Sequence, residues 1–501
     1  MQLPIMINPN NGHSLQNQIF EQLQDMILDG RLKPGTPVPA TRIFAEQINV
    51  SRNTVMLAYE RLSIEGYLQT RRAVGTFVSF DLPENPMQPG DSVNPQHPEP
   101  NSDTDLQPIL FQGKRHPVVN RNRRRLAVDF WVGRPDARSF PTKTWRRLMI
   151  RMLSRSGSNL TEYGDPAGLP ELRQAIADHL GPARGITARP EQVIVVNGSQ
   201  EGLNIAARLF VRDGSPVVVE CPCYQGAANL MMSYGADLIP IPVDEDGMDV
   251  SKLPDKTASL AYVTPSHQYP LGSTLTLERR LRLLRWARKT GAYIIEDDYD
   301  CDFRYHGSPL TALKGLDTHD NVMYLGTFSK SIGAGLRVGY LVVPDRLIEP
   351  ATTVKALYDN GHSWLAQAVL AEFISGGSFA NHLRRIRHTY MQRRDCLVEA
   401  LTAHFGDVDL LGVDGGMHLV WRLPSDFPQA EELQELALRC GVGIYSLNDG
   451  AAYDFNQTTC ADCSSQDAGC AQRIIMLGYS STTGKQITDG VARLQKALPR
   501  N

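Results

Sequence analysis

The sequence predicts a multidomain α/β protein in which a small helical domain precedes a larger domain built on a mainly parallel sheet. The chain has 501 residues, which is too long for a single hydrophobic core. Three helical segments and two short strands occupy the first 80 residues. From Leu126 onward, apolar strands alternate with amphipathic helices, which is the pattern of a parallel sheet covered by helices.

The overall composition is typical of a soluble globular protein, with 42% hydrophobic and 21% charged residues. The net charge of -3 gives no general attraction to nucleic acid, so any DNA binding has to come from a local surface. No apolar run is long enough for a membrane span, no signal-peptide pattern is present, and eight cysteines are too sparse for a disulfide scaffold. These features predict a cytoplasmic protein without a membrane partner.

Residues 12–80 are predicted to form the small domain. Apolar residues at helical spacing predict a first helix from Ser14, its N-cap, to Gly30. Two further helices and two short strands are expected at Thr41–Ile48, Ser51–Gly66, Tyr67–Thr70 and Thr76–Val78. Three helices followed by a hairpin make a winged helix-turn-helix.

The third helix of this domain begins with a run of small polar residues and one arginine, Ser51-Arg52-Asn53-Thr54. Such residues at a helix N-terminus can reach base edges and phosphates together, which favours DNA recognition. A small protein-interaction domain is the alternative, and the balance of local charges does not decide between the two.

The same segment resembles the GntR-type winged helix over nearly its whole length. The matching stretches include Leu32-Lys-Pro-Gly, Pro39-Ala-Thr-Arg42, Val50-Ser-Arg-Asn-Thr-Val55 and Gly75-Thr-Phe-Val78. The resemblance implies that double-stranded operator DNA is contacted by Arg42, Ser51, Arg52, Asn53, Thr54 and, at the tip of the wing, Arg72.

Residues 81–126 are predicted to be a flexible linker, because proline, asparagine, glutamine and aspartate dominate and no helical or strand period is visible. The linker ends in the basic run Arg121-Asn-Arg-Arg-Arg125. That run either touches phosphates or is simply a solvated charged segment.

Residues 127–501 are predicted to form the larger domain, with a large part to about residue 345 and a small part over about residues 346–501. Its candidate strands are Val193–Val196, Val217–Glu220, Leu260–Val263, Tyr293–Glu296, Val322–Leu325 and Val338–Val343. Binding sites in such sheets lie beyond the C-terminal ends of the strands, where polar candidates follow several of these segments.

Lys330 follows one of these strands in a loop of small residues and hydroxyls. Burial there lowers the pKa of a lysine and frees its lone pair, as a Schiff-base lysine requires. Thr327, Ser329 and Arg337 around it can hold a phosphate. The alternative is an ordinary solvated loop lysine.

Other strand ends carry residues suited to a flat, phosphorylated ring. Gly198, Ser199 and Gln200 open a helix whose N-terminus suits a phosphate. Tyr224 can stack on a ring, although it can equally be a packing residue. Asp297 can pair with a pyridinium nitrogen, and Tyr299 can donate to a ring hydroxyl.

The Lys330 stretch and these strand ends resemble the cofactor site of fold-type I aminotransferases, which depend on pyridoxal 5'-phosphate (PLP). The resemblance runs from about Asp129 to the C-terminus. It implies PLP as the cofactor, a smaller C-terminal α+β subdomain and a homodimer. It also implies that Tyr163 reaches a phosphate across the dimer and that Arg473 grips the carboxylate of an effector.

The chain departs from the aminotransferase pattern in one turn. Aminotransferases usually carry an asparagine in an Asn-Pro-Thr-Gly turn, and this chain has Ser266-His267-Gln268-Tyr269-Pro270. Either His267 or Gln268 replaces the asparagine, which holds the ring hydroxyl. This form resembles the MocR/GabR group of regulators, which join a GntR-type head to an aminotransferase-like body in the order seen here.

A polar stretch near the C-terminus contains Cys460, Cys463 and Cys470. Three cysteines can ligate zinc with a fourth ligand, but no histidine and no second Cys-x-x-Cys pair lie nearby. A surface loop close to the effector pocket is the preferred interpretation, and no metal site is predicted.

Together the resemblances imply a MocR-type transcription regulator that senses PLP, or an amino compound exchanging with it, through Lys330. The heads of a homodimer would then pack against the opposite body and read two half-sites. An active aminotransferase with an accessory head is the alternative, and a body that serves only for dimerisation is a third possibility. Effector, target genes and direction of control stay open.

Overall fold

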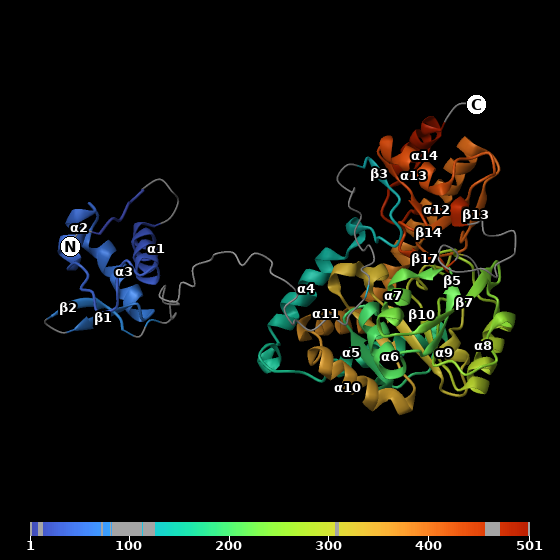
Figure 1. The fold of residues 1–501 in the computed structure, drawn as a ribbon, viewed down its shortest axis with the longest axis horizontal. Coiled ribbons are helices and arrows are strands. Elements are labelled where there is room, and N and C mark those ends of the chain that lie inside the picture. Colours follow the sequence, from blue (N-terminus) through green and yellow to red (C-terminus); the bar gives the residue numbers. More distant parts are fainter. Residues whose placement is uncertain are drawn as a thin grey trace, which may run out of the picture. The chain divides into compact units, whose positions relative to one another are not determined.

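The computed structural model describes residues 3–8, 14–71, 74–80, 82, 113, 126–305, 310–455 and 471–498. It divides the chain into two compact units, residues 1–108 and residues 109–501 (Figure 1). Arg72, the three cysteines of the polar stretch and almost all of the predicted linker lie outside the described residues.

The N-terminal unit is the predicted winged helix-turn-helix. Its elements are α1 (Leu15–Leu28), α2 (Thr41–Gln47), α3 (Arg52–Ile64), β1 (Leu68–Arg71) and β2 (Gly75–Val78), the two strands being antiparallel. Ser14 and Ser51 cap α1 and α3, as predicted, by accepting hydrogen bonds from main-chain amides. Fully buried Leu23, Phe44 and Leu62 join the three helices into one core.

An eight-stranded sheet forms the centre of the second unit. Its strands, in spatial order, are β4 (Val193–Val196), β12 (Gly339–Val342), β11 (Val322–Thr327), β10 (Tyr293–Asp297), β9 (Leu260–Val263), β5 (Pro216–Cys221), β7 (Asp237–Asp244) and β8 (Gly247–Met248). Strands β12 and β8 run antiparallel to their neighbours and the other pairs are parallel, so the predicted mainly parallel sheet is confirmed.

Helices cover both faces of this sheet (Figure 1). Val193 and Val195 of β4 pack into one hydrophobic core, and Ile194 and Val196 pack into another, so the strand is buried on both sides. The helices between residues 142 and 375 are α4 (Thr142–Leu153), α5 (Pro170–Arg184), α6 (Ser199–Phe210), α7 (Gln225–Ser233), α8 (Leu277–Thr290), α9 (Leu313–Leu316), α10 (Ile348–Asp359) and α11 (Trp364–Ser375).

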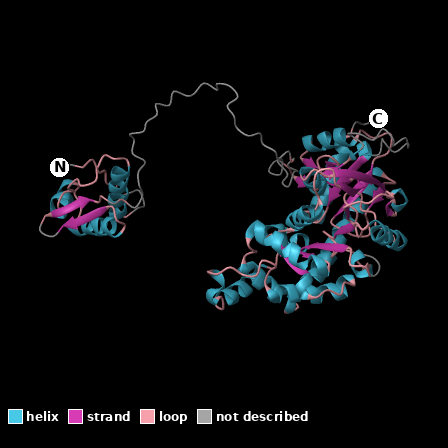
Figure 2. Cartoon of the chain, turned by 60° about the horizontal axis from the view of Figure 1, so that its bottom comes forward, coloured by secondary structure: helices cyan, strands magenta, loops and turns pink. Residues whose placement is uncertain are grey.

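The C-terminal part is a smaller α+β subdomain, in which cyan helices lie beside magenta strands in Figure 2. Its antiparallel sheet contains β13 (Asp409–Leu411), β14 (His418–Arg422), β18 (Ile474–Gly478) and β16 (Tyr445–Ser446). Its helices are α12 (Ser378–Phe405), α13 (Ala430–Arg439) and α14 (Gly484–Ala497). Two short pairs complete the body, β3 (Val128–Asp129) with β15 (Val442–Gly443) and β6 (Cys223–Tyr224) with β17 (Ala452–Tyr453).

Within the described ranges, no helix combines the length and the apolar character that crossing a membrane requires.

Candidate functional site

Lys330 lies directly beyond the C-terminal end of β11. The residues around it form a π-helical turn, Ser329–Gly333, where the sequence had suggested an irregular loop. The Lys330 ammonium donates a hydrogen bond of 2.8 Å to the carbonyl oxygen of Gly133. Burial lowers the pKa of Lys330 below the usual lysine value, while Asp300 and Asp297 act in the opposite direction. Lys330 is therefore a partly desolvated amine and not a solvated surface group.

Asp297 ends the neighbouring strand, β10, and is buried. Its Oδ2 accepts a hydrogen bond of 2.9 Å from the Tyr262 hydroxyl. Its Oδ1 is also buried, and no described residue donates to it. Burial raises the pKa of Asp297 to about 7. A carboxylate with one unpaired buried oxygen is suited to receive a cationic ring nitrogen, which would satisfy both its charge and its lone pair.

The arginine predicted to hold a phosphate lies against the start of α6. Arg337 adopts a left-handed backbone conformation (φ 54°), and its Nη2 donates a hydrogen bond of 2.7 Å to the carbonyl of Asn197. A Cβ atom at Gly198 would lie 2.5 Å from that Nη2, so only glycine leaves room for the guanidinium. Ser199, the first residue of α6, places helix amides next to this arginine.

Two further phosphate candidates are hydrogen-bonded to each other. The Thr327 hydroxyl donates to Ser329 Oγ at 2.9 Å, and the Ser329 amide donates to Thr327 Oγ1 at 3.1 Å. Gln200 points elsewhere, because its amide nitrogen donates to the carbonyl of Gly226 at 3.1 Å. Thr327 and Ser329 thus form one local hydroxyl pair beside Lys330.

Three aromatic side chains converge beside Asp297. Tyr269 stands edge-on to Tyr224 and Tyr299, with ring centroids 5.9 and 5.7 Å apart. The sequence analysis did not select Tyr269 as a site residue. Its position directly before Pro270 was the signal, because that is where the aminotransferase turn has its asparagine.

His267 and Gln268, the two residues considered as replacements for that asparagine, point in different directions. His267 Nδ1 lies 3.0 Å from the Tyr299 hydroxyl. The Gln268 amide donates to the carbonyls of Pro222 and Tyr269 at 2.8 and 2.7 Å. His267 is therefore the residue next to Tyr299, the predicted donor to the ring hydroxyl. Gln268 is hydrogen-bonded to the main chain of Pro222 and Tyr269 instead.

Arg473 is not brought to this cluster. Its guanidinium donates to the main-chain carbonyls of residues 424, 425 and 427. Arg473 ends the short helical turn Ala471–Arg473 that precedes β18. Because its guanidinium is engaged by these carbonyls, the effector site proposed below does not include it.

Tyr163 is 89% exposed, as expected for a residue that reaches a second subunit. In the N-terminal unit, the DNA candidates Arg42, Ser51, Arg52 and Asn53 are exposed and Thr54 is half-buried. These five residues surround the N-terminal ends of α2 and α3. The sixth candidate, Arg72, lies outside the described residues.

Two family models match the chain. The model described as "Bacterial regulatory proteins, gntR family" matches residues 15–78, and "Aminotransferase class I and II" matches residues 128–452. A "Probable rhizopine catabolism regulatory protein MocR" of Rhizobium meliloti is 36% identical over 97% of this chain and 94% of its own length. The chain belongs to the MocR-type regulators of the GntR family.

Other relatives share the architecture of this MocR-type chain. The "HTH-type pyridoxine biosynthesis transcriptional regulator PdxR" of Corynebacterium glutamicum is 32% identical over 89% of this chain and 91% of its own. Among solved structures, a kynurenine aminotransferase of Pyrococcus horikoshii is 28% identical, with a TM-score of 0.64 over 74% of this chain and 90% of its own. A GntR-type head on an aminotransferase-like body identifies a DNA-binding transcription regulator.

The Asp297→Asn variant is expected to be more stable than the wild-type protein when both lack the cofactor. This difference should grow as the pH rises from about 4 to about 7. The folded state binds a proton at Asp297 up to about pH 7, whereas the unfolded carboxyl loses it near 3.8. The stability that the protonated Asp297 gives the wild-type protein is therefore complete below the unfolded pKa of 3.8. It is lost as the pH rises toward the folded pKa of about 7, by up to about 1.4 kcal/mol per pH unit.

Urea unfolding of both proteins without PLP at several pH values measures this difference. Asparagine keeps an acceptor for the Tyr262 hydroxyl, so the comparison isolates the proton. A stability difference between the two proteins that does not change with pH would contradict the assignment.

Proposed function

We propose that this chain is a PLP-responsive transcription regulator whose body holds PLP through Lys330 and responds to PLP or to an amino compound. One observation carries the proposal: Asp297, with its unpaired buried oxygen, ends β10, and the Lys330 amine follows the adjacent parallel strand β11, so that in the proposed complex one pyridine ring meets both. PLP supplies an aldehyde that condenses with a primary amine and releases water.

The remaining residues fit the other parts of the cofactor. Arg337, with Gly198 and the N-terminus of α6, is suited to the phosphate, assisted by the hydroxyls of Thr327 and Ser329. In this proposal Tyr224 stacks on the ring. In the same proposal the Tyr299 hydroxyl, which lies 3.0 Å from His267 Nδ1, donates to the ring hydroxyl.

Lys330 connects the cofactor to the signal. An effector amine that takes its place leaves the lysine side chain free, and its position against the Gly133 carbonyl then becomes available again. Such an exchange changes DNA binding only if the two conformations of the protein differ in affinity for the effector. The regulator acts on chromosomal operators, which places it in the cytoplasm.

We include a homodimer in the proposal. Ile150 and Leu153 of α4 are 59% and 45% exposed, and Tyr163 follows on the same segment. An exposed apolar stretch ending in an exposed tyrosine suits contact with a second copy. In that dimer each Tyr163 would reach the partner's phosphate, and each head would pack on the opposite body.

The visible absorption spectrum after PLP addition tests the proposal. The wild-type protein is expected to acquire a PLP-dependent visible band. Borohydride should remove this band, because it reduces the carbon–nitrogen double bond between PLP and the lysine side chain. A protein that gains no such visible band in saturating PLP would contradict the proposal.

Transamination is a second candidate function, favoured by the retained Lys330, Asp297 and Arg337 and by the 28% identity to a kynurenine aminotransferase. Tyr269 in the asparagine position argues for, at most, a slow half-reaction. Conversion of bound PLP to its amine form by added amino acids, with release of the keto acid, would establish it.

A further inference from the structure

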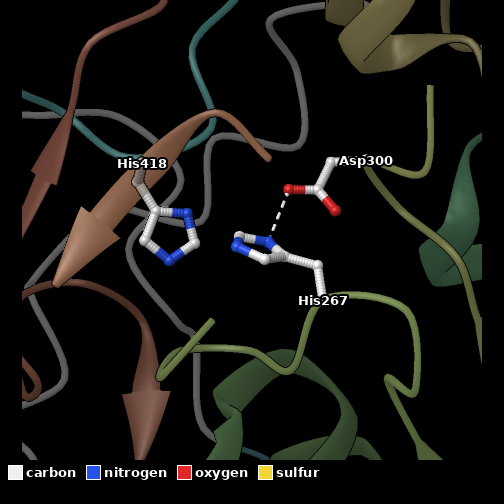
Figure 3. A group of neighbouring side chains, drawn as sticks. All are labelled: His267, Asp300 and His418. Carbon is white, nitrogen blue, oxygen red and sulfur yellow. Dashed lines mark hydrogen bonds and ion pairs between the residues drawn. The ribbon is translucent and has the colours of Figure 1, made fainter. Parts of the chain in front are cut away.

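A second polar cluster lies beside the proposed cofactor site and shares one residue, His267, with it. It consists of His267, Asp300 and His418, whose side chains converge in Figure 3. All three are at least nine-tenths buried, at 6%, 4% and 1% exposure. They come from the loop after β9, the loop after β10 and the start of β14, so the large and small parts of the body both contribute.

Each imidazole has one nitrogen engaged. His267 Nδ1 lies 2.9 Å from Asp300 Oδ2, and a carboxylate draws the ring proton to that nitrogen. His418 Nε2 lies 2.9 Å from the carbonyl oxygen of Pro270, which can only accept, so this nitrogen carries the proton. Burial lowers the pKa of His418 to about 4, so its ring is neutral near pH 7.

His418 Nδ1 is therefore an acceptor, and His267 Nε2 is the acceptor of that ring in the tautomer that donates to Asp300. Neither His267 Nε2 nor His418 Nδ1 has a hydrogen-bond partner in the described part of the chain, and both atoms are buried. The ring centroids are 5.1 Å apart, and in Figure 3 the unpaired edge of His267 faces the His418 ring. Leaving a buried acceptor without a donor is unfavourable. A pair of such acceptors indicates a donor that the described residues do not supply.

Glycine backbone and a cavity adjoin His267. Cβ atoms at Gly272 and Gly412 would each lie 3.2 Å from His267 Nε2, and one at Gly416 would lie 2.2 Å from His267 Cε1. All three glycines also have positive φ, which residues with a side chain rarely adopt. Both the short contacts and the backbone conformation therefore exclude a side chain at these positions. His267 and these glycines line a cavity of about 1150 Å³.

The cluster is also close to the reactive amine. Asp300 acts to raise the pKa of Lys330, and Lys330 acts to lower the pKa of His418. The ring of Tyr269 contacts both Tyr299 and His418, at centroid distances of 5.7 and 5.8 Å. Tyr269 therefore connects the residues of the cofactor site with the cluster.

We propose that His267 Nε2 and His418 Nδ1 recognise a hydrogen-bond donor on the effector, a hydroxyl or second amino group, and thereby set effector specificity. The inference rests on the proposed function and names the class of its effector. A carboxylate has only acceptor oxygens, so two imidazole lone pairs disfavour it. Arg473, the side chain expected to bind a carboxylate, is engaged by three carbonyls elsewhere.

The test uses four short amines and the PLP-loaded, full-length protein. Ethanolamine and propylamine have the same size, and only ethanolamine ends in a donor. 1,3-Diaminopropane and 3-aminopropanoate form a second pair, ending in an ammonium and a carboxylate. Titration followed in the visible spectrum is expected to give apparent affinities at least about tenfold higher for the donor of each pair.

Two variants of His418 provide the matched control. His418→Phe removes the acceptor and keeps a ring, so the preference for ethanolamine over propylamine should disappear. His418→Asn keeps an acceptor near the Nδ1 position, so part of the preference should remain. Retained selectivity in His418→Phe would overturn the inference.

The remaining outcomes are equally decisive. Equal affinities for ethanolamine and propylamine, or tightest binding of 3-aminopropanoate, would contradict donor recognition. Loss of the preference on adding a chelator would show that the pair binds a metal ion instead, which also overturns the inference. Absence of any PLP-dependent band contradicts the proposed function itself, whereas a band without selectivity contradicts this inference alone.

Discussion

Replacing Lys330 with alanine is expected to abolish covalent retention of PLP while the body stays folded. The substitution removes Nζ, the only atom proposed to form a covalent bond to the cofactor. It costs the fold one hydrogen bond to the Gly133 carbonyl, and alanine is readily accommodated in a helical turn. Intact-protein mass after PLP and borohydride treatment measures the effect: the wild-type protein should gain the mass of a phosphopyridoxyl group, and the variant should not.

Lys289→Ala is the matched control for this experiment. Lys289 is 70% exposed and pairs with Asp255 on the surface, so its removal tests for nonspecific reaction of PLP with lysines. The control should take up PLP like the wild-type protein. A Lys330→Ala protein that still gains the mass would place the bond on another amine and refute the assignment.

Replacing Arg52 with alanine is expected to weaken operator binding by about 1–3 kcal/mol, as for an arginine that reads a base edge. Arg52 is the first residue of α3, it is exposed, and Ser51 fixes the helix start by accepting from the Thr54 amide at 3.1 Å. The measurement is fluorescence anisotropy with a fragment selected from random DNA by the full-length protein.

Arg31→Ala serves as the control, because Arg31 lies in the same unit but pairs with Asp29 in the turn after α1. It should leave operator affinity nearly unchanged. Equal weakening of Arg52→Ala on operator and unrelated DNA would make Arg52 a phosphate contact and contradict base readout.

The strand-end residues could be predicted because each buried strand is an unbroken apolar run that stops at a polar residue. Asp297 was found in this way at the end of β10, and Lys330 was found in the turn that follows β11. The antiparallel direction of β12 could not be predicted, since a fully buried strand has the same apolar pattern in either direction.

The partners of the site residues were less accessible to sequence reasoning. His418 lies about 150 residues from His267, and only the packing of β14 against the loop after β9 brings them together. The partners of Arg473 were also inaccessible, because the carbonyls that it contacts belong to residues 424, 425 and 427, about 50 residues earlier in the chain.

In the proposed function, one chain combines PLP binding at Lys330 with DNA recognition by α3. The most direct test is the affinity of the full-length protein for its operator with and without bound PLP, measured by anisotropy in the same preparation. PLP is expected to change this affinity, and Lys330→Ala, which cannot hold the cofactor covalently, is expected not to respond. Identical wild-type affinities in the PLP-free protein, with PLP, and with PLP plus each tested amine would contradict the proposed function.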